Sequence, residues 1–287
     1  MNLPLTDART DAGFDDENDA VTDKALKAKL RAVWAAGDYA AVARKAIPEL
    51  GAVVAAAARV GPGDRVLDVA AGSGNASLPA AHAGATVTAL DLTPPLLEAG
   101  RRAAEQQALS IAFDEGDAEA MPYPDDTFDA VISCVGVMFA PHHAPAACEL
   151  TRVARPGGRL ALVSWTPDGF IGRLLAAVTP FLPPPPPGVQ PALKWGDADY
   201  VRDLFGDHVT GMTASRRMLP VDRFRTPEEV RDMFRDLYGP TMGAYAAVRD
   251  DAARIADLDA AIVSLAAAAM ADGHMQWGYL LVTALVR

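Results

Sequence analysis

The residues best suited to chemistry gather in one short stretch, Val66 to Ala76, which reads VLDVAAGSGNA. A predicted buried strand carries Asp68, and small residues then form a tight turn in which glycine allows close approach of backbone to a ligand. The turn leads into a predicted helix, whose first N–H groups and partial positive charge suit a carboxylate or phosphate. A Gly-rich turn alone is equally consistent with a plain strand-to-helix junction.

Two more carboxylates follow predicted strands and sharpen that interpretation. Asp91 ends the second strand, 17 residues after Gly74, where a carboxylate can accept hydrogen bonds from both hydroxyls of a ribose. Asp117 follows the third strand and could accept from an adenine amino group, with the Ala118 N–H reaching a ring nitrogen. Asp68 would repel a dinucleotide pyrophosphate but attract a cationic amino-acid tail.

Strands and helices alternate through the middle of the chain, which predicts a parallel, doubly wound α/β sheet. Helices are predicted from Gly72 to about His82, from Pro94, over about 144–155, from Thr226, and over about 250–271. The predicted strands are 65–70, 86–90, 111–115, 128–134, 159–165, 209–219 and 277–286.

Composition excludes several classes of partner. The 287 residues carry a net charge of −11, so a nucleic-acid backbone or an anionic membrane would be repelled. No apolar run is long enough to span a bilayer, and the acidic N-terminal stretch is unlike a signal peptide. The two cysteines, Cys134 and Cys148, are too few for a disulfide framework. We expect a cytoplasmic monomer or homodimer acting on a small molecule. Abundant alanine and arginine are typical of a GC-rich bacterial genome.

Four stretches in order across about residues 60–166 carry a family resemblance: VLDVAAGSGNA, VTALDLTPPLLEAGR, GDAEAMPYPDDTFDAVISCVGVMF and ELTRVARPGGRLAL. They resemble class I S-adenosylmethionine-dependent methyltransferases, particularly the group related to ubiquinone and menaquinone C-methyltransferases. The resemblance implies a Rossmann-like, doubly wound, mostly parallel seven-stranded sheet whose last strand is antiparallel, matched here by MQWGYLLVTALVR. It also implies S-adenosyl-L-methionine as cofactor and S-adenosyl-L-homocysteine as product.

The resemblance assigns cofactor contacts to matching positions. Asp91 would hold the ribose hydroxyls, Leu92 would pack beside the adenine, and Asp117 and Ala118 would contact the adenine edge. Cys134 matches a position near the methionyl group, although it could equally be a small buried apolar residue. The positions that would line the methionine and ribose side are Asp68, Ala70, Gly72, Ser73 and Gly74.

The segment RAVWAAGDYAAVA resembles the cofactor lid that precedes the sheet in many small-molecule members of the family. It places Trp34 and Tyr39 at the cofactor, and a lid would exclude water from the charged sulfonium. An amphipathic helix that packs Trp34 into the core is the alternative. The expected organisation is an N-terminal lead (1–20), a helical lid (21–60) and a methyltransferase domain (61–287) with cap elements at about 168–207 and 222–272.

The sequence also offers candidate residues for catalysis and for substrate binding. His142 and His143 follow the fourth strand at the expected ligand edge, where a histidine could act as a general base, or they could simply begin a helix facing solvent. No spacing of histidine and cysteine indicates a metal site. An aromatic, methionine-bearing pocket would suit a planar or lipophilic molecule, although each residue could instead pack the cap. The candidates are Trp165, Phe170, Trp195, Tyr238, Met242 and Tyr245.

The predicted reaction is in-line transfer of a methyl group to an oxygen, nitrogen or carbon nucleophile of a small molecule. A nicotinamide-dependent oxidoreductase is one alternative, disfavoured by Asp68 and by Ser77 where a third glycine would stand. A non-catalytic protein that binds S-adenosylmethionine is the other.

Overall fold

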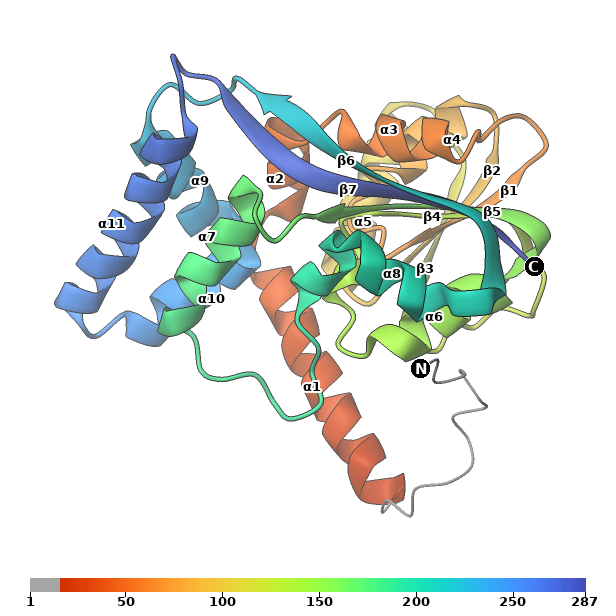
Figure 1. Ribbon diagram of the computed structural model, residues 1–287, viewed down its shortest axis with the longest axis horizontal. Helices are drawn as coiled ribbons and strands as arrows, with labels where there is room; N and C mark the ends of the chain where they lie inside the picture. Colours follow the sequence, from red (N-terminus) through yellow and green to blue (C-terminus); the bar gives the residue numbers. More distant parts are fainter. Residues whose placement is uncertain (1–15) are drawn as a thin grey trace.

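A single seven-stranded sheet organises the chain in the computed structural model, which describes residues 16–287 (Figure 1). The strand order is β3-β2-β1-β4-β5-β7-β6; β1 to β5 pair in parallel, and β7 is antiparallel to both β5 and β6. The strands are β1 (Arg65–Val69), β2 (Thr86–Asp91), β3 (Ile111–Glu115), β4 (Phe128–Cys134), β5 (Ala154–Trp165), β6 (Val209–Val221) and β7 (Met275–Val286). The predicted mixed sheet with an antiparallel last strand is therefore confirmed.

The helices flank this sheet on both sides. They are α1 (Asp16–Ala36), α2 (Tyr39–Ala46), α3 (Leu50–Ala57), α4 (Ser77–His82), α5 (Pro94–Gln106), α6 (His143–Arg152), α7 (Phe170–Val178), α8 (Ala198–Phe205), α9 (Pro227–Leu237), α10 (Gly239–Val248) and α11 (Ala252–Ala269). Most of the expected lead, residues 1–15, lies outside the described residues, and α1 already begins at Asp16.

The central strands β1 and β4 are buried almost along their whole length because helices cover both faces of a parallel sheet. Their apolar runs made the strand positions predictable. β5 begins earlier than the predicted Arg159, since Ala154 pairs with Phe128 before the register shifts along β4. The helix after the Gly-rich turn begins at Ser77, later than expected, because positive φ angles extend the turn through Gly74.

A cap of four helices lies beyond one end of the sheet, at the left of Figure 1. α7 packs on α11, and α9 and α10 pack on α11 and on each other. The predicted cap element at 168–207 holds two helices with different partners. Its first helix, α7, joins the cap, whereas α8 packs against α6 and β6 at the sheet.

Stacked aromatic rings join the cap to the sheet. The rings of Phe170 on α7 and Trp277 on β7 stack with centroids 5.3 Å apart, and Phe234 on α9 lies 5.9 Å from the same indole. All three side chains are fully buried. Burial of such rings contributes roughly 2–3 kcal/mol each, so this cluster fixes the cap on the sheet.

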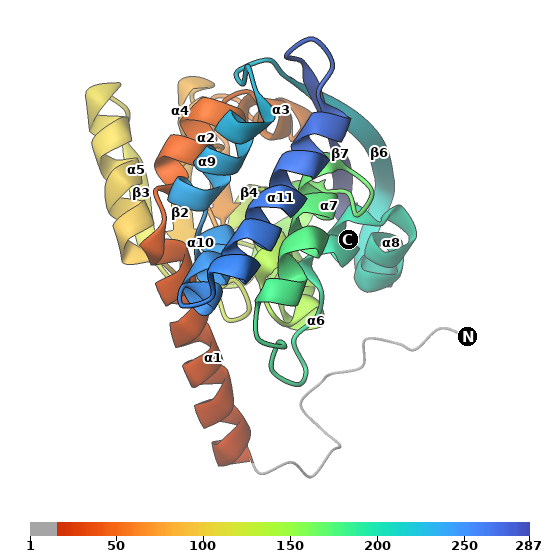
Figure 2. The same ribbon diagram turned by 90° about the vertical axis from the view of Figure 1, so that its left-hand side faces the viewer.

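α1 projects from the body of the molecule, as Figure 2 shows from the side of the cap. The C-terminal end of α1 is held by close contact between its backbone and the backbone at the α9–α10 junction. A Cβ atom on Gly37 would lie 2.4 Å from the Leu237 carbonyl oxygen, and one on Gly239 would lie 2.2 Å from the Val33 carbonyl oxygen. Glycine at both places lets the end of α1 contact the α9–α10 junction directly.

Candidate functional site

The Gly-rich turn folds at the carboxyl end of β1, where ligands bind in open α/β sheets. Ala70, Gly72 and Gly74 all have positive φ angles, of 52°, 57° and 85°. The turn is tied to β2 by a hydrogen bond from the Ala71 N–H to the Leu90 carbonyl oxygen, 2.9 Å long. The left-handed backbone conformation of Ala70 costs about 1 kcal/mol, and the hydrogen bond from Ala71 to Leu90 offsets this cost.

Gly136 lets the end of β4 approach that turn. A Cβ atom there would lie 2.2 Å from the Ala70 carbonyl oxygen, so no other residue fits without movement of the backbone. Sequence reasoning missed Gly136, because its constraint comes from a residue 66 positions away.

Asp91 lies at the centre of the site, at the tip of β2. Its two carboxylate oxygens accept the N–H groups of Gly72 and Thr93, each at 2.8 Å. Burial raises the pKa of Asp91, and these hydrogen bonds act in the opposite direction. A carboxylate oxygen accepts more than one hydrogen bond, so Asp91 can still accept from ligand hydroxyls.

Asp68 lies deeper, behind the turn. Its Oδ2 accepts the Ser77 hydroxyl at 2.6 Å, and its Oδ1 is buried without a hydrogen-bond partner among the described residues. Burial raises the pKa of Asp68 to about 7. An unsatisfied buried carboxylate oxygen is costly, and a cationic ligand group near the turn would compensate for it.

The loop after β3 forms one lip of the site. Asp117 Oδ1 accepts the Glu119 N–H at 2.9 Å, and Asp117 Oδ2 lies 2.6 Å from the ammonium nitrogen of Lys27 on α1. The Gly116 N–H donates to the Asp91 carbonyl oxygen at 3.0 Å, which links this lip to the tip of β2.

Aromatic side chains form another part of the wall, where Trp34, Tyr39 and Phe139 line the cavity. The indole of Trp34 on α1 lies 4.8 Å from the ring of Phe139, 5.7 Å from Tyr39 and 6.0 Å from Tyr238, all in edge-on geometry. The Tyr39 ring also lies over the Gly72 turn, since a Cβ atom on Gly72 would be 3.7 Å from it. Burial raises the pKa of the Tyr39 and Tyr238 hydroxyls, so both stay protonated as hydrogen-bond donors.

Turn, lip and wall enclose a cavity of about 820 Å³, counting its open mouth. Most of the predicted cofactor residues line it, whereas Asp68, Ser73 and Gly74 lie behind its wall. The predicted residues on the wall are Trp34, Tyr39, Ala70, Gly72, Asp91, Leu92, Asp117, Ala118 and Cys134. Lining residues that sequence reasoning missed include Lys27, Leu30, Asn75, Leu96, Gly136 and Phe139.

Cys134 lines the cavity with a protonated thiol rather than a reactive thiolate. Burial raises the pKa of its thiol, and the carboxylate of Asp68 raises it further. The Asn75 amide lies 3.6 Å from the sulfur, which makes Asn75 a second polar group on this part of the wall.

The two histidines proposed as bases lie outside the cavity lining. The Nδ1 atom of His142 lies 2.9 Å from Glu119 Oε2, and its backbone N–H donates to Glu119 Oε1 at 2.6 Å. His143 is fully buried with its Nδ1 2.8 Å from the Tyr200 hydroxyl, and burial lowers its pKa to about 4. The geometry thus gives both residues structural contacts and removes support for a general base at either position.

The predicted substrate residues divide into two groups. Trp165, Phe170 and Trp195 are buried in the core. Phe170 packs the cap against Trp277, which is the alternative that the sequence left open for each residue. Tyr238 contacts the aromatic wall through Trp34, whereas the Tyr245 hydroxyl donates to Asp259 at 2.6 Å and Met242 lies on the same helix, α10. None of the six lines the cavity itself, and Tyr238 lies against Trp34, which does.

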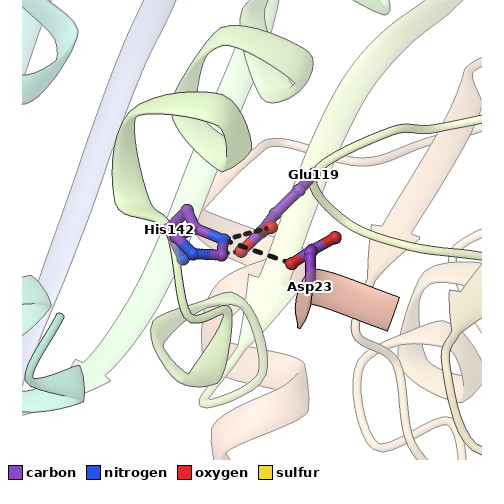
Figure 3. Close-up of side chains that lie close together, drawn as sticks. All are labelled: Asp23, Glu119 and His142. Carbon is purple, nitrogen blue, oxygen red and sulfur yellow. Dashed lines mark hydrogen bonds and ion pairs between the residues drawn. The ribbon is translucent and has the colours of Figure 1, made fainter. Parts of the chain in front are cut away.

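One cluster of metal-ligand types does form, although no spacing predicted it. Asp23, Glu119 and His142 bring one ligand atom each within 4.8 Å of one another (Figure 3). The Lys27 ammonium already supplies a cation there, 2.8 Å from an oxygen of Asp23 and 2.8 Å from one of Glu119. The expectation that the protein needs no metal stays a prediction.

Comparison with known proteins identifies the family. Residues 67–162 match the family described as a methyltransferase domain. A demethylmenaquinone methyltransferase of Thermus thermophilus is 34% identical over 59% of this chain and 71% of its own length. This chain belongs to the class I S-adenosylmethionine-dependent methyltransferases. The matched segment of this methyltransferase holds Asp68, the Gly-rich turn, Asp91 and Asp117, the residues on which the resemblance was based.

The methyltransferase also has relatives that match it over most of its length. An uncharacterized protein of Mycobacterium tuberculosis is 51% identical over 91% of this chain and 96% of its own. The YcgJ protein of Bacillus subtilis has the same fold, with a TM-score of 0.56 at 16% identity over 83% of this chain and 98% of its own. Family membership argues against the nicotinamide-dependent alternative. No helix within residues 16–287 is both long and apolar enough to cross a membrane.

Proposed function

We propose that this enzyme binds S-adenosylmethionine in the cavity at the strand tips and methylates a small, largely apolar molecule held against the aromatic wall. The observation that carries the proposal is the composition of the cavity lining. It combines carboxylates, Asp91 at the tip of β2 and Asp117 in the loop after β3, with the aromatic rings of Trp34, Tyr39 and Phe139.

The residues present fit the cofactor. Asp91 lines the cavity with hydrogen-bonding capacity to spare for two ribose hydroxyls, and Asp117 with the Ala118 N–H offers an acceptor and a donor to adenine. The buried Oδ1 of Asp68, with no partner among the described residues, favours a positively charged group on the far side of the turn. When bound, S-adenosylmethionine supplies an activated methyl group for in-line displacement.

The protein's own contribution is placement and exclusion of water. Trp34 and Phe139 come from segments more than a hundred residues apart, and their rings are in contact where they line the cavity. A dry site strengthens electrostatic interactions with a cation, and a fixed approach line lowers the entropic part of the barrier. Because neither His142 nor His143 lines the cavity, the proposal assigns neither of them the role of a base.

The test has two stages. Titration calorimetry with S-adenosylhomocysteine and with NAD comes first; binding of S-adenosylhomocysteine alone is expected. Transfer of radiolabelled methyl groups to a panel of apolar phenols, amines and enols then identifies the acceptor atom. Binding of NAD alone would contradict the proposal, and cofactor binding with no transfer to any acceptor would favour the non-catalytic alternative.

A further inference from the structure

Lys27 joins α1 to the nucleoside end of the cavity. Its ammonium nitrogen lies 2.8 Å from Asp23, 2.6 Å from Asp117 and 2.8 Å from Glu119. Asp23 lies one turn earlier on α1, whereas Asp117 and Glu119 belong to the lip after β3. One side chain therefore bridges two segments about ninety residues apart in the sequence.

The bridge is largely buried. The side chains of Lys27 and Glu119 are 15% and 4% exposed. Three carboxylates surround one ammonium, and loss of the ammonium would leave like charges in contact without compensation. Burial alone would lower the pKa of Lys27, but hydrogen bonds to Asp117, Asp23 and Glu119 outweigh it and hold the pKa above its usual range. Lys27 therefore stays charged at neutral pH.

Asp117 owes its orientation to this contact. Its two oxygens are held from two directions, Oδ1 by the Glu119 N–H and Oδ2 by Lys27. Both Lys27 and Asp117 line the cavity beside Ala118. The carboxylate that would accept from a purine amino group is thus held in place by a residue of the helix that covers it.

The contacts of Trp34, Gly37 and Arg31, on or next to α1, do not involve Asp117. Trp34 packs against the aromatic wall, and Gly37 holds the end of the helix at the α9–α10 junction. Arg31 pairs with Glu115 at 2.6 Å, but both side chains are close to half exposed, and exposed pairs contribute little.

We propose that Lys27 is a positioning residue for the nucleoside: it orients Asp117 toward the purine and thereby sets the preference for a 6-amino group. The inference rests on the proposed function, since it assumes that the cavity holds S-adenosylmethionine. An oriented carboxylate accepts well from an amino N–H but repels the carbonyl oxygen of an inosine base. A carboxylate that has lost its counter-ion and turned away discriminates less.

Calorimetry with S-adenosylhomocysteine and S-inosylhomocysteine tests this on Lys27→Met, whose unbranched side chain keeps the packing of the lysine stem. The wild type should prefer the adenosyl ligand, and the variant should lose roughly tenfold in affinity for it, with a clearly smaller loss for the inosyl ligand. Arg31→Met is the matched control, because it removes a charge from the same helix away from the cavity; both affinities should stay unchanged.

The ratio of the two affinities distinguishes a change in the orientation of Asp117 from a general loss of protein stability. If Lys27→Met weakens both ligands equally, or neither, the inference is wrong. If the wild type binds neither ligand, the proposed function itself fails and the inference fails with it. Lys27→Gln serves as a second variant should Lys27→Met not fold, since an amide carries no charge to offset three carboxylates; the preference should fall there too.

Discussion

Two parts of the cavity lining, the proposed nucleoside end and the aromatic end, are built differently. At the nucleoside end, Asp91 and the Gly-rich turn lie at the tips of adjacent parallel strands, β1 and β2, within 25 residues of each other. At the aromatic end, Trp34, Tyr39, Phe139 and Tyr238 come from α1, α2, the turn after β4 and the start of α10. The first end depends on a local motif, and the second depends on how distant helices pack.

This difference bears on how each end can change. A strand tip is fixed by the hydrogen bonds of the sheet, so the residues at the strand tips that are proposed to hold the nucleoside keep one geometry. The aromatic end can change its shape when the cap changes, without disturbing the strands. A common cofactor and variable acceptors are the expected consequence, since one fold hosts many substrates.

The largest expected effect falls on the nucleoside end. Asp91→Ala removes the acceptor for the Gly72 and Thr93 N–H groups and for ligand hydroxyls, and cofactor affinity should fall by about 1.5–3 kcal/mol, or ten- to more than a hundredfold. Calorimetry measures the loss. Glu98→Gln on the exposed side of α5 is the control, and an Asp91→Ala affinity equal to that of this control would remove Asp91 from the site.

Trp34→Ala tests the aromatic end. The variant loses edge-on contacts with Phe139, Tyr39 and Tyr238, and because the indole is only partly buried the free energy of unfolding should fall by roughly 2 kcal/mol. Transfer to an apolar acceptor should fall more than cofactor affinity does. Thermal unfolding, calorimetry and methyl-transfer rates separate these effects. Equal losses of methyl transfer and of cofactor affinity would contradict separate roles for the two ends.

Much of the nucleoside end could be predicted from the sequence, because Asp91 and Asp117 follow strands that apolar runs already mark. Lys27, Phe139 and Gly136 could not, because each is defined by a partner brought near by packing of α1 or β4. The histidines and the buried tryptophans were misplaced for a related reason. Their residue types suggested chemistry. In the structure, however, His142 contacts Glu119 and His143 contacts Tyr200, while Trp165 and Trp195 pack in the core.

A smaller effect should appear with pH. The pKa of Asp68 is raised to about 7 in the folded protein, above the ordinary value near 4, so the carboxyl is mainly neutral below that pH and ionised above it. An ionised carboxylate attracts a cationic tail, so cofactor affinity should rise roughly three- to tenfold between pH 6 and pH 8. Because the pKa of Asp68 is higher in the folded protein than in the unfolded chain, the neutral carboxyl stabilises the fold at low pH. That contribution is lost as the pH rises through about 7.

Titration calorimetry across that pH range measures the change. Asp68→Asn is the matched variant, because the amide can still accept the Ser77 hydroxyl but does not ionise. Its affinity should be flat with pH. A wild-type affinity that falls between pH 6 and pH 8 would contradict a role for ionised Asp68.

The smallest effect is expected for His142→Ala. The imidazole contacts Glu119 outside the cavity lining, so turnover should change by less than about threefold at any pH, the loss of one partly exposed contact. Initial rates from pH 6 to pH 9 provide the measurement. A loss of turnover of more than a hundredfold, with cofactor affinity kept, would restore His142 as a general base.

A crystal structure with S-adenosylhomocysteine tests the central claim most directly. The account predicts density in the cavity between α1 and the strand tips, with both ribose hydroxyls on the Asp91 carboxylate and the purine beside Asp117 and Ala118. Density for the nucleoside at any other place, or an Asp91 carboxylate that contacts no ligand atom, would contradict it.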